Sequence, residues 1–79
     1  MKIKLAKKET IHFIGIGGIG MSGLSLIMKS QGFKVQGSDI AYNKNIDRLK
    51  KEKTKIFLSH SKKNLKNATI VVISSAIKN

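Results

Sequence analysis

The sequence contains no cysteine, so no disulfide stabilises the chain and no thiolate is available to bind a metal ion. It contains no proline either, and therefore no proline-rich linker between domains. No apolar run approaches the roughly 20 residues that a membrane-spanning helix needs. With 79 residues, the chain is long enough for one small domain. We therefore expect a single domain over residues 1–79, without signal peptide or membrane insertion, in a reducing compartment such as the cytoplasm.

Acidic residues are scarce, with four Asp and Glu against 16 Lys and Arg, a formal net charge of +12. Such a charge attracts anions and raises nucleic acid as a partner. Specific readers of nucleic acid use arginine forks and aromatic stacking, whereas this chain has one arginine, Arg48, and few aromatic residues. We therefore expect an anionic ligand but no specific nucleic acid, and a basic nucleic-acid-binding module remains an alternative. Two histidines and four scattered acids predict no metal site.

Short apolar runs alternate with amphipathic or polar segments. Strands are expected at residues 11–14, 33–36, 55–58 and 70–73. The last run is continuously β-branched, as in a strand buried on both faces. This alternation predicts the α/β class, with a small Rossmann-like parallel sheet of about four strands and flanking helices.

Two helices are expected between these strands, at residues 21–31 and 43–53, and a single turn at residues 61–67. The first helix is expected to end at Gly32 in a left-handed cap. The second is expected to begin at Asn43 or Asn45, with Ile46 and Leu49 facing inward. The residues expected to place the first helix against the core are Met21, Leu24, Ile27 and Met28.

A glycine-rich loop with the pattern G-x-G-x-x-G, residues 15–20, joins the first strand to the first helix. Gly15 permits the turn, Gly17 permits close approach of a diphosphate, and Gly20 permits close packing of helix and strand. The amides of the first helical turn then point at the phosphates. Asp39, at the end of the next expected strand, is placed to bind a ribose.

The pattern predicts phosphate binding but leaves the nucleotide open, because one fold serves many functions. A nicotinamide or flavin dinucleotide would make the chain part of an oxidoreductase. Another nucleotide diphosphate fits the same loop equally well. Asp39 also has a purely structural alternative, as a turn residue or as a partner of Lys34 or Lys44. His12, on the first strand, is interpreted as a structural histidine.

A longer string, HFIGIGGIGMSGL at residues 12–24, resembles the opening of the UDP-N-acetylmuramate–L-alanine ligases of the Mur ligase family. Further blocks follow in the family's order: Gly37-Ser38-Asp39, then His60, then SSAI at residues 74–77. The resemblance implies an N-terminal domain that binds the UDP part of UDP-N-acetylmuramic acid. The full-length enzyme adds L-alanine in peptidoglycan synthesis, and so serves cell-wall biogenesis, cell shape and cell division.

The resemblance also implies which residues touch this substrate. The loop and the first helical turn would face the diphosphate, Ser38 and Asp39 would lie beside the uridine, and the remaining blocks would line the same edge. The substrate-binding residues so implied are Gly17, Gly18, Ile19, Gly20, Met21, Ser38, Asp39, His60, Ser74, Ser75 and Ala76. No catalytic residue is implied.

The chain departs from the family's pattern at three positions, with Lys53 and Ser59 in place of glycines and Thr69 in place of an acid. We expect only local backbone effects at Lys53 and Thr69. No G-x-x-x-x-G-K-[ST] occurs, so no γ-phosphate site is expected. The resemblance implies that ATP, which phosphorylates the sugar carboxylate before the amine of alanine attacks the acyl phosphate, binds further domains together with Mg. We expect this chain to bind its substrate without a cofactor and to catalyse no reaction by itself.

Overall fold

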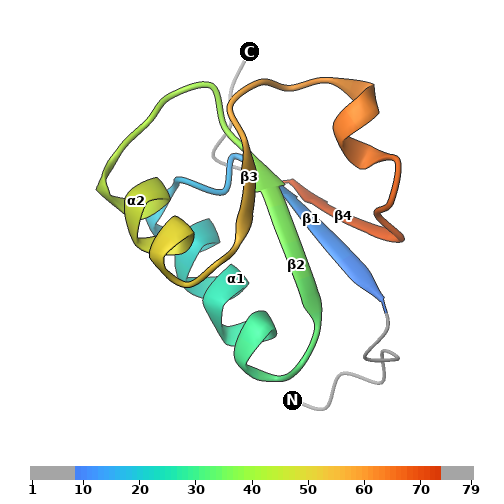
Figure 1. The fold of residues 1–79 in the computed structure, drawn as a ribbon, viewed down its shortest axis with the longest axis horizontal. Helices are drawn as coiled ribbons and strands as arrows, with labels where there is room; N and C mark the ends of the chain where they lie inside the picture. Colours follow the sequence, from blue (N-terminus) through green and yellow to red (C-terminus); the bar gives the residue numbers. More distant parts are fainter. Residues whose placement is uncertain (1–8, 74–79) are drawn as a thin grey trace.

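The computed structural model describes residues 9–73, which form one sheet with α1 and α2 on one face and η1 on the other (Figure 1). The strands are all parallel and lie in the order β3-β2-β1-β4. This confirms the predicted fold class. The elements are β1 Thr10–Ile14, α1 Ile19–Ser30, β2 Lys34–Ser38, α2 Lys44–Lys51, β3 Lys55–Phe57, η1 Lys62–Leu65 and β4 Ile70–Ile73.

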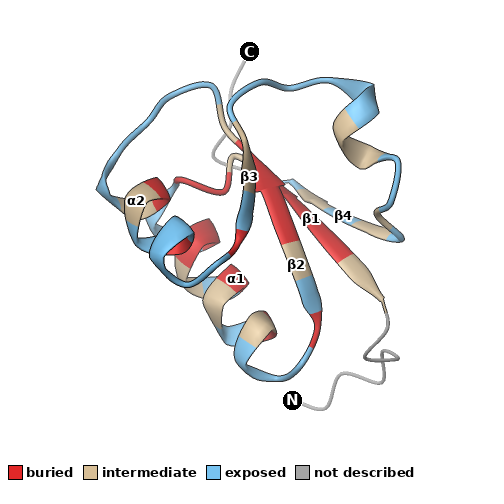
Figure 2. Cartoon of the chain, in the orientation of Figure 1, coloured by how far each residue is buried: buried red, intermediate tan, exposed pale blue. Residues whose placement is uncertain are grey.

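The hydrophobic core lies between the sheet and the two α-helices, where buried residues concentrate (Figure 2). β1 is central in the sheet and contributes two of the most buried side chains, Ile11 and Phe13. The other buried apolar residues are Ile16, Met21, Met28, Phe33, Ile46 and Leu49.

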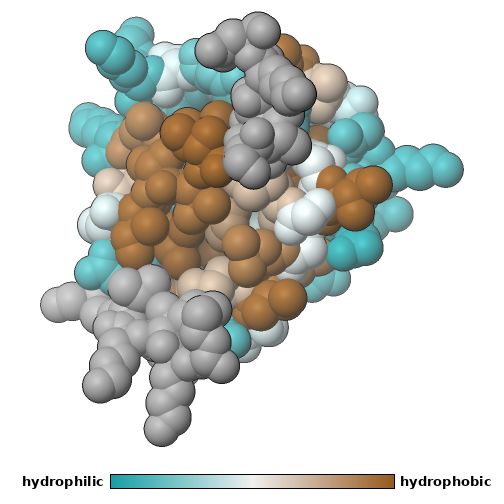
Figure 3. Space-filling model, turned by 180° about the vertical axis from the view of Figure 1, so that it is seen from behind, coloured by the Kyte–Doolittle hydropathy of each residue, from teal (hydrophilic) through white to brown (hydrophobic). Residues whose placement is uncertain are grey.

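β4 lies at the edge of the sheet formed by the described strands, and one of its faces is partly exposed, which corrects the prediction that both faces are buried. It pairs with β1 alone among the described strands. Alternate side chains are exposed, with Val71 at 43% and Ile73 at 63%, because they point to the face that η1 covers only in part. A broad hydrophobic area is visible on the molecule from behind (Figure 3). The continuous apolar sequence of β4 is therefore not a sign that both faces of this strand are buried.

The inward face of α1 differs from the prediction. Met21 and Met28 are buried as expected, but Leu24 and Ile27 are 42% and 54% exposed. The apolar i, i+3, i+4 spacing pointed to the wrong face. No helix in the described part of the chain is long and apolar enough to cross a membrane.

Two serines complete the buried face of α1 in place of the leucine and isoleucine. Ser22 Oγ donates to Ile19 O at 3.1 Å, and Ser25 Oγ donates to Ser22 O at 2.8 Å. A serine that bonds its own helix backbone leaves no polar group unsatisfied when buried. The small side chains let α1 lie close to the sheet.

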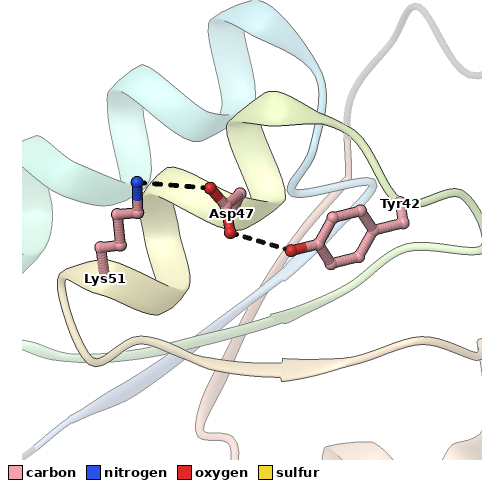
Figure 4. A network of polar contacts seen from close by, with 3 residues as sticks. All are labelled: Tyr42, Asp47 and Lys51. Atoms are coloured by element: carbon pink, nitrogen blue, oxygen red, sulfur yellow. Dashed lines mark hydrogen bonds and ion pairs between the residues drawn. The ribbon is translucent and has the colours of Figure 1, made fainter.

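α2 begins and ends with well-formed caps. Asn43, one of the two predicted caps, accepts a hydrogen bond from the Ile46 amide at 3.0 Å. The loop before the helix is held by Tyr42, whose hydroxyl donates to Asp47 Oδ1 at 3.0 Å, while Lys51 pairs with the same carboxylate (Figure 4).

The three departures from the family's pattern have local effects. Lys53 follows α2 in the left-handed region, with φ of 63°, where glycine is favoured. Ser59 has no such conformation, and its carbonyl accepts from Asn64 Nδ2 at 2.7 Å. Thr69 Oγ1 accepts from the Thr10 amide at 3.1 Å and donates to the Thr10 carbonyl at 3.2 Å, which fixes the start of β4 on β1.

Candidate functional site

The glycine loop leaves the carboxyl end of β1, at the sheet edge where parallel α/β proteins bind their ligands. Gly15 has φ of 81° and makes the predicted turn. The amides of Gly15 and Ile16 both donate to the Ser38 carbonyl of β2, at 2.8 and 3.1 Å. The loop is therefore fixed to the end of the neighbouring strand.

Gly37 of β2 makes room for this loop. A Cβ at Gly37 would lie 2.4 Å from Ile16 Cδ1 and 2.8 Å from the Phe13 carbonyl oxygen. The Ile16 side chain, which is fully buried, lies over the space that this glycine leaves. β2 continues past its predicted end at residue 36, and Ser38 pairs with Ile14.

Gly17 faces protein atoms on both sides. Its amide donates to Asp39 Oδ2 at 2.8 Å, and its carbonyl accepts from Asn45 Nδ2 at 2.8 Å and from Asn43 Nδ2 at 3.2 Å. A Cβ would lie 2.8 Å from Asp39 Oδ2 and 3.0 Å from Ile46 Cδ1. Glycine is therefore required at this position by the packing of α2 and the Asp39 loop.

Asp39 acts as a brace between the glycine loop and the loop after β2. Its second oxygen, Oδ1, accepts from the Ala41 amide at 3.1 Å. Neither Lys34 nor Lys44 pairs with it, since the ion pair found within residues 9–73 is Lys51 with Asp47. Both carboxylate oxygens of Asp39 thus have backbone partners in the protein.

Three consecutive amides at the start of α1, those of Ile19, Gly20 and Met21, have no acceptor among the described residues. The N-cap, Gly18, provides no side-chain hydrogen bond, and the first turn holds no acidic residue. The Gly18 amide donates to Gly15 O at 3.0 Å. Unpaired amides and the positive end of the helix dipole together favour an anion.

Gly20 does not have the packing role predicted for it. A Cβ built on it meets no atom within 4 Å, and the residue is exposed. The absence of a side chain instead leaves open space beside the three amides.

A cavity of about 190 Å³ opens at the same edge of the sheet, between β1, β2 and the segment that leads into η1. Ser38 connects the cavity to the glycine loop, because its carbonyl holds the loop while its hydroxyl lines the cavity. Lys62 supplies a positive charge at the rim. The lining residues are His12, Ile14, Ser38, His60, Ser61, Lys62 and Leu65.

A chain of hydrogen bonds runs under this cavity. Gln36 Nε2 donates to the Asn64 carbonyl and to His12 Nδ1, both at 2.8 Å. His12 Nε2 lies 3.2 Å from Ser38 Oγ, which lies 2.8 Å from His60 Nδ1. The chain leads from the interior to an exposed histidine at the cavity mouth.

His12 is completely buried, which agrees with its structural interpretation. Desolvation lowers the pKa of His12 below 6.5, and the nearby His60 lowers it further. Its ring also stacks on Phe57, with centroids 6.1 Å apart. The side chain is therefore neutral near pH 7, with both ring nitrogens hydrogen-bonded.

The structure brings the predicted residues within 9–73 to one edge of the sheet, in two groups. The loop and the first turn of α1 form one group, braced by Asp39; Ser38 and His60 form the other, in the cavity wall. The predicted positions Ser74, Ser75 and Ala76 lie outside the described residues.

The sequence interpretation missed Gln36 and Lys62, and the link from His12 to the site. A signal was present for two of them. His12 and Gln36 are polar residues within predicted strands, and the parallel register places them side by side on one face of the sheet. Because side chains alternate between the two faces of a strand, His12, Gln36 and Ser38 all belong to the face on which the cavity lies.

Comparisons with known proteins point to one family. Residues 10–79 match the family described as "Mur ligase family, catalytic domain". The chain is 75% identical over 79 residues to the UDP-N-acetylmuramate–L-alanine ligase of Pelagibacter ubique (strain HTCC1062), covering all of this chain and 17% of that protein. It is 60% identical over 68 residues to the ligase of the same name from Rickettsia typhi (strain ATCC VR-144 / Wilmington), covering 86% of this chain and 14% of that one.

A solved structure has the same fold. The crystal structure of the UDP-N-acetylmuramate–alanine ligase from Thermotoga maritima superposes with a TM-score of 0.81 at 39% identity, over 87% of this chain and 16% of that chain. The chain thus spans about a sixth of the length of the proteins it matches. Because the family match extends from the first strand onward, the chain belongs to the Mur ligase family.

Proposed function

We propose that this chain binds the UDP part of UDP-N-acetylmuramic acid, as the N-terminal domain of a cytoplasmic ligase that adds L-alanine in peptidoglycan synthesis. The observation that carries the proposal is the row of three amides at the start of α1 that have no acceptor within residues 9–73, at the sheet edge where the cavity also opens. Its 75% identical relative is named for a substrate that contains a nucleoside diphosphate.

The two groups of residues divide the ligand between them. The Ile19, Gly20 and Met21 amides provide donors for the diphosphate without any side-chain cation. Ser38 and His60 line the cavity that would take the nucleoside. Asp39 holds the Gly17 amide in place, and its carboxylate oxygens, each with one backbone partner, keep further acceptor capacity for the ribose, as first predicted.

The chain itself does not fit ATP and Mg. In a P-loop, lysine follows the last glycine and reaches the terminal phosphates. Here Met21 follows Gly20, and its side chain is buried in the core. ATP and Mg therefore belong, in this proposal, to other domains of the full-length ligase, and this chain alone binds substrate without activating it.

The test is a thermal-shift measurement on the 79-residue chain with UDP-N-acetylmuramic acid, NADH and duplex DNA as separate ligands. The proposal expects the UDP-sugar to raise the melting temperature, since a ligand that binds only the folded state stabilises it. Stabilisation by NADH alone would favour a dinucleotide-dependent oxidoreductase. Stabilisation by DNA alone, lost steeply with salt, would favour a nucleic-acid-binding module.

A further inference from the structure

The hydrogen-bond chain below the cavity has a defined direction, which follows from the chemistry of its inner end. The amide nitrogen of Gln36 can only donate, and it lies 2.8 Å from both the Asn64 carbonyl and His12 Nδ1. The Asn64 carbonyl can only accept, which fixes the amide nitrogen, and not the amide oxygen, at this position. His12 Nδ1 must therefore be an acceptor.

The direction then passes outward from His12. A neutral imidazole with an accepting Nδ1 carries its proton on Nε2, so His12 Nε2 donates to Ser38 Oγ. Ser38 is 2% exposed, and within residues 9–73 its hydroxyl proton has one acceptor in reach, His60 Nδ1 at 2.8 Å. Neutral His60 must then carry its proton on Nε2.

We propose that Gln36 and His12 are positioning residues that hold His60 as a hydrogen-bond donor toward the ligand. They set the tautomer of His60 through Ser38, although Gln36 does not line the cavity. This inference deepens the proposed function and rests on it for the identity of the ligand. It commits the outer nitrogen of His60 to an acceptor on that ligand, either a base carbonyl or a phosphate oxygen.

The tautomers can be measured by nitrogen-15 NMR of both histidines in the ligand-free chain, at a pH well above the free imidazole pKa of about 6.5. We expect both rings to carry the proton on Nε2 alone. A His60 ring protonated on Nδ1 overturns the proposal without reference to any ligand. This measurement therefore tests the relay, by which we mean the hydrogen-bond chain from Gln36 through His12 and Ser38 to His60, separately from UDP-sugar binding.

Substitution of Gln36, at the inner end of the relay, tests whether a residue that does not line the cavity controls the tautomer of His60. Gln36→Met removes both donors while keeping a buried side chain of similar length, so His12 and His60 should become mixtures of tautomers. Gln31→Met, the same change at an exposed position after α1, should leave both rings unchanged. Unchanged tautomers in a folded Gln36→Met chain would refute the relay.

A second experiment measures the affinities of the chain for UDP and for CDP, which share their phosphates but differ at position 4 of the base. Uracil presents an oxygen acceptor there, and cytosine presents an amino donor. If His60 donates to this carbonyl, UDP binds about tenfold or more tighter, and Gln36→Met narrows the gap. If His60 donates to phosphate or to the C2 carbonyl that both bases share, UDP and CDP bind alike and Gln36→Met weakens both. Affinities for both that are unaffected by Gln36→Met would overturn the assigned role.

Discussion

Lys53 adopts a backbone conformation that suits glycine better than lysine. Its amide donates to Lys50 O at 2.9 Å, and the next amide, of Thr54, donates to Leu49 O at 3.0 Å. These two bonds close α2 in the same way that Gly32 closes α1, where φ is 95°. A side chain in this left-handed region costs about 1–2 kcal/mol.

Replacement of Lys53 by glycine should therefore stabilise the fold. We expect Lys53→Gly to raise the free energy of unfolding by about 0.5–1 kcal/mol, because relief of the backbone strain exceeds the entropy that glycine adds to the unfolded chain. Urea denaturation measures the change. The reverse exchange, Gly32→Lys, should lower the same quantity. A destabilised Lys53→Gly chain would contradict the strain assigned to this residue.

His12 makes the stability of the fold depend on pH. Its pKa in the folded chain lies below 6.5, because burial and His60 disfavour the charged ring, whereas the unfolded ring titrates near 6.5. The unfolded chain therefore binds more protons as the pH falls through 6.5, and the free energy of unfolding must fall in that window.

Denaturant titrations at a series of pH values between neutral and mildly acid will measure this loss. The stability should be flat above the unfolded pKa and should decrease below it until the folded ring titrates. A stability that stays constant or rises as the pH falls would show that His12 accepts a proton without penalty.

At the scale of elements, the start of α1 offers a clean test of the phosphate site. A methyl group on Gly20 meets no protein atom within 4 Å, so Gly20→Ala should fold and gain about 0.5–1 kcal/mol of stability. The same methyl stands beside the unpaired amides, and we expect it to weaken UDP-sugar binding about tenfold or more, a loss of about 1.4 kcal/mol.

Gly23→Ala is the matched control for this experiment. Gly23 lies one turn further along α1, and a Cβ on it also meets nothing within 4 Å. It should stabilise the helix to the same extent and leave the affinity close to that of the parent chain. Equal affinities of Gly20→Ala and the parent, measured by calorimetry, would remove the diphosphate from this helix end. Gly17 is unsuitable for the same purpose, because a side chain there displaces Asp39 and Ile46.

The elements differ in how far the sequence predicted them. Strand periodicity and turn chemistry located all four strands and the Gly32 cap, and gave Asn43 as one of two possible caps of α2, because each depends on residues close in sequence. The face of α1 was wrong, because Ser22 and Ser25 satisfy their hydroxyls within the helix and so become buriable. Hydropathy alone treats them as polar.

The candidate site was predictable in position but not in its contacts. The glycine pattern placed the loop at the end of β1, and Ser38 and His60 came from the resemblance. The brace from Asp39 to Gly17 was not predictable, because it joins residues whose proximity depends on the order of the strands. The same holds for the bond from Gln36 to Asn64.

At the scale of the whole molecule, the dominant property is a net charge of +12. Within residues 9–73 a single ion pair, Lys51 with Asp47, offsets it. Self-repulsion of like charges disfavours the compact state, and dissolved salt screens it.

Stability should therefore rise with ionic strength. Between very low salt and about 0.15 M, we expect the free energy of unfolding to increase by on the order of 1 kcal/mol. The double variant Lys63→Glu with Lys66→Glu, at two exposed positions, should flatten the dependence by lowering the net charge. Stability that decreases with salt in the parent chain would mean that attractive pairs outweigh the repulsion.

Gly37 has an effect outside its own strand. The smallest substitution there, to alanine, would push on Ile16, whose backbone belongs to the turn that holds the amides of α1 in position. Ligand affinity would then respond to a residue that no ligand touches. The position of the α1 amides therefore depends on the absence of a side chain at Gly37 of β2.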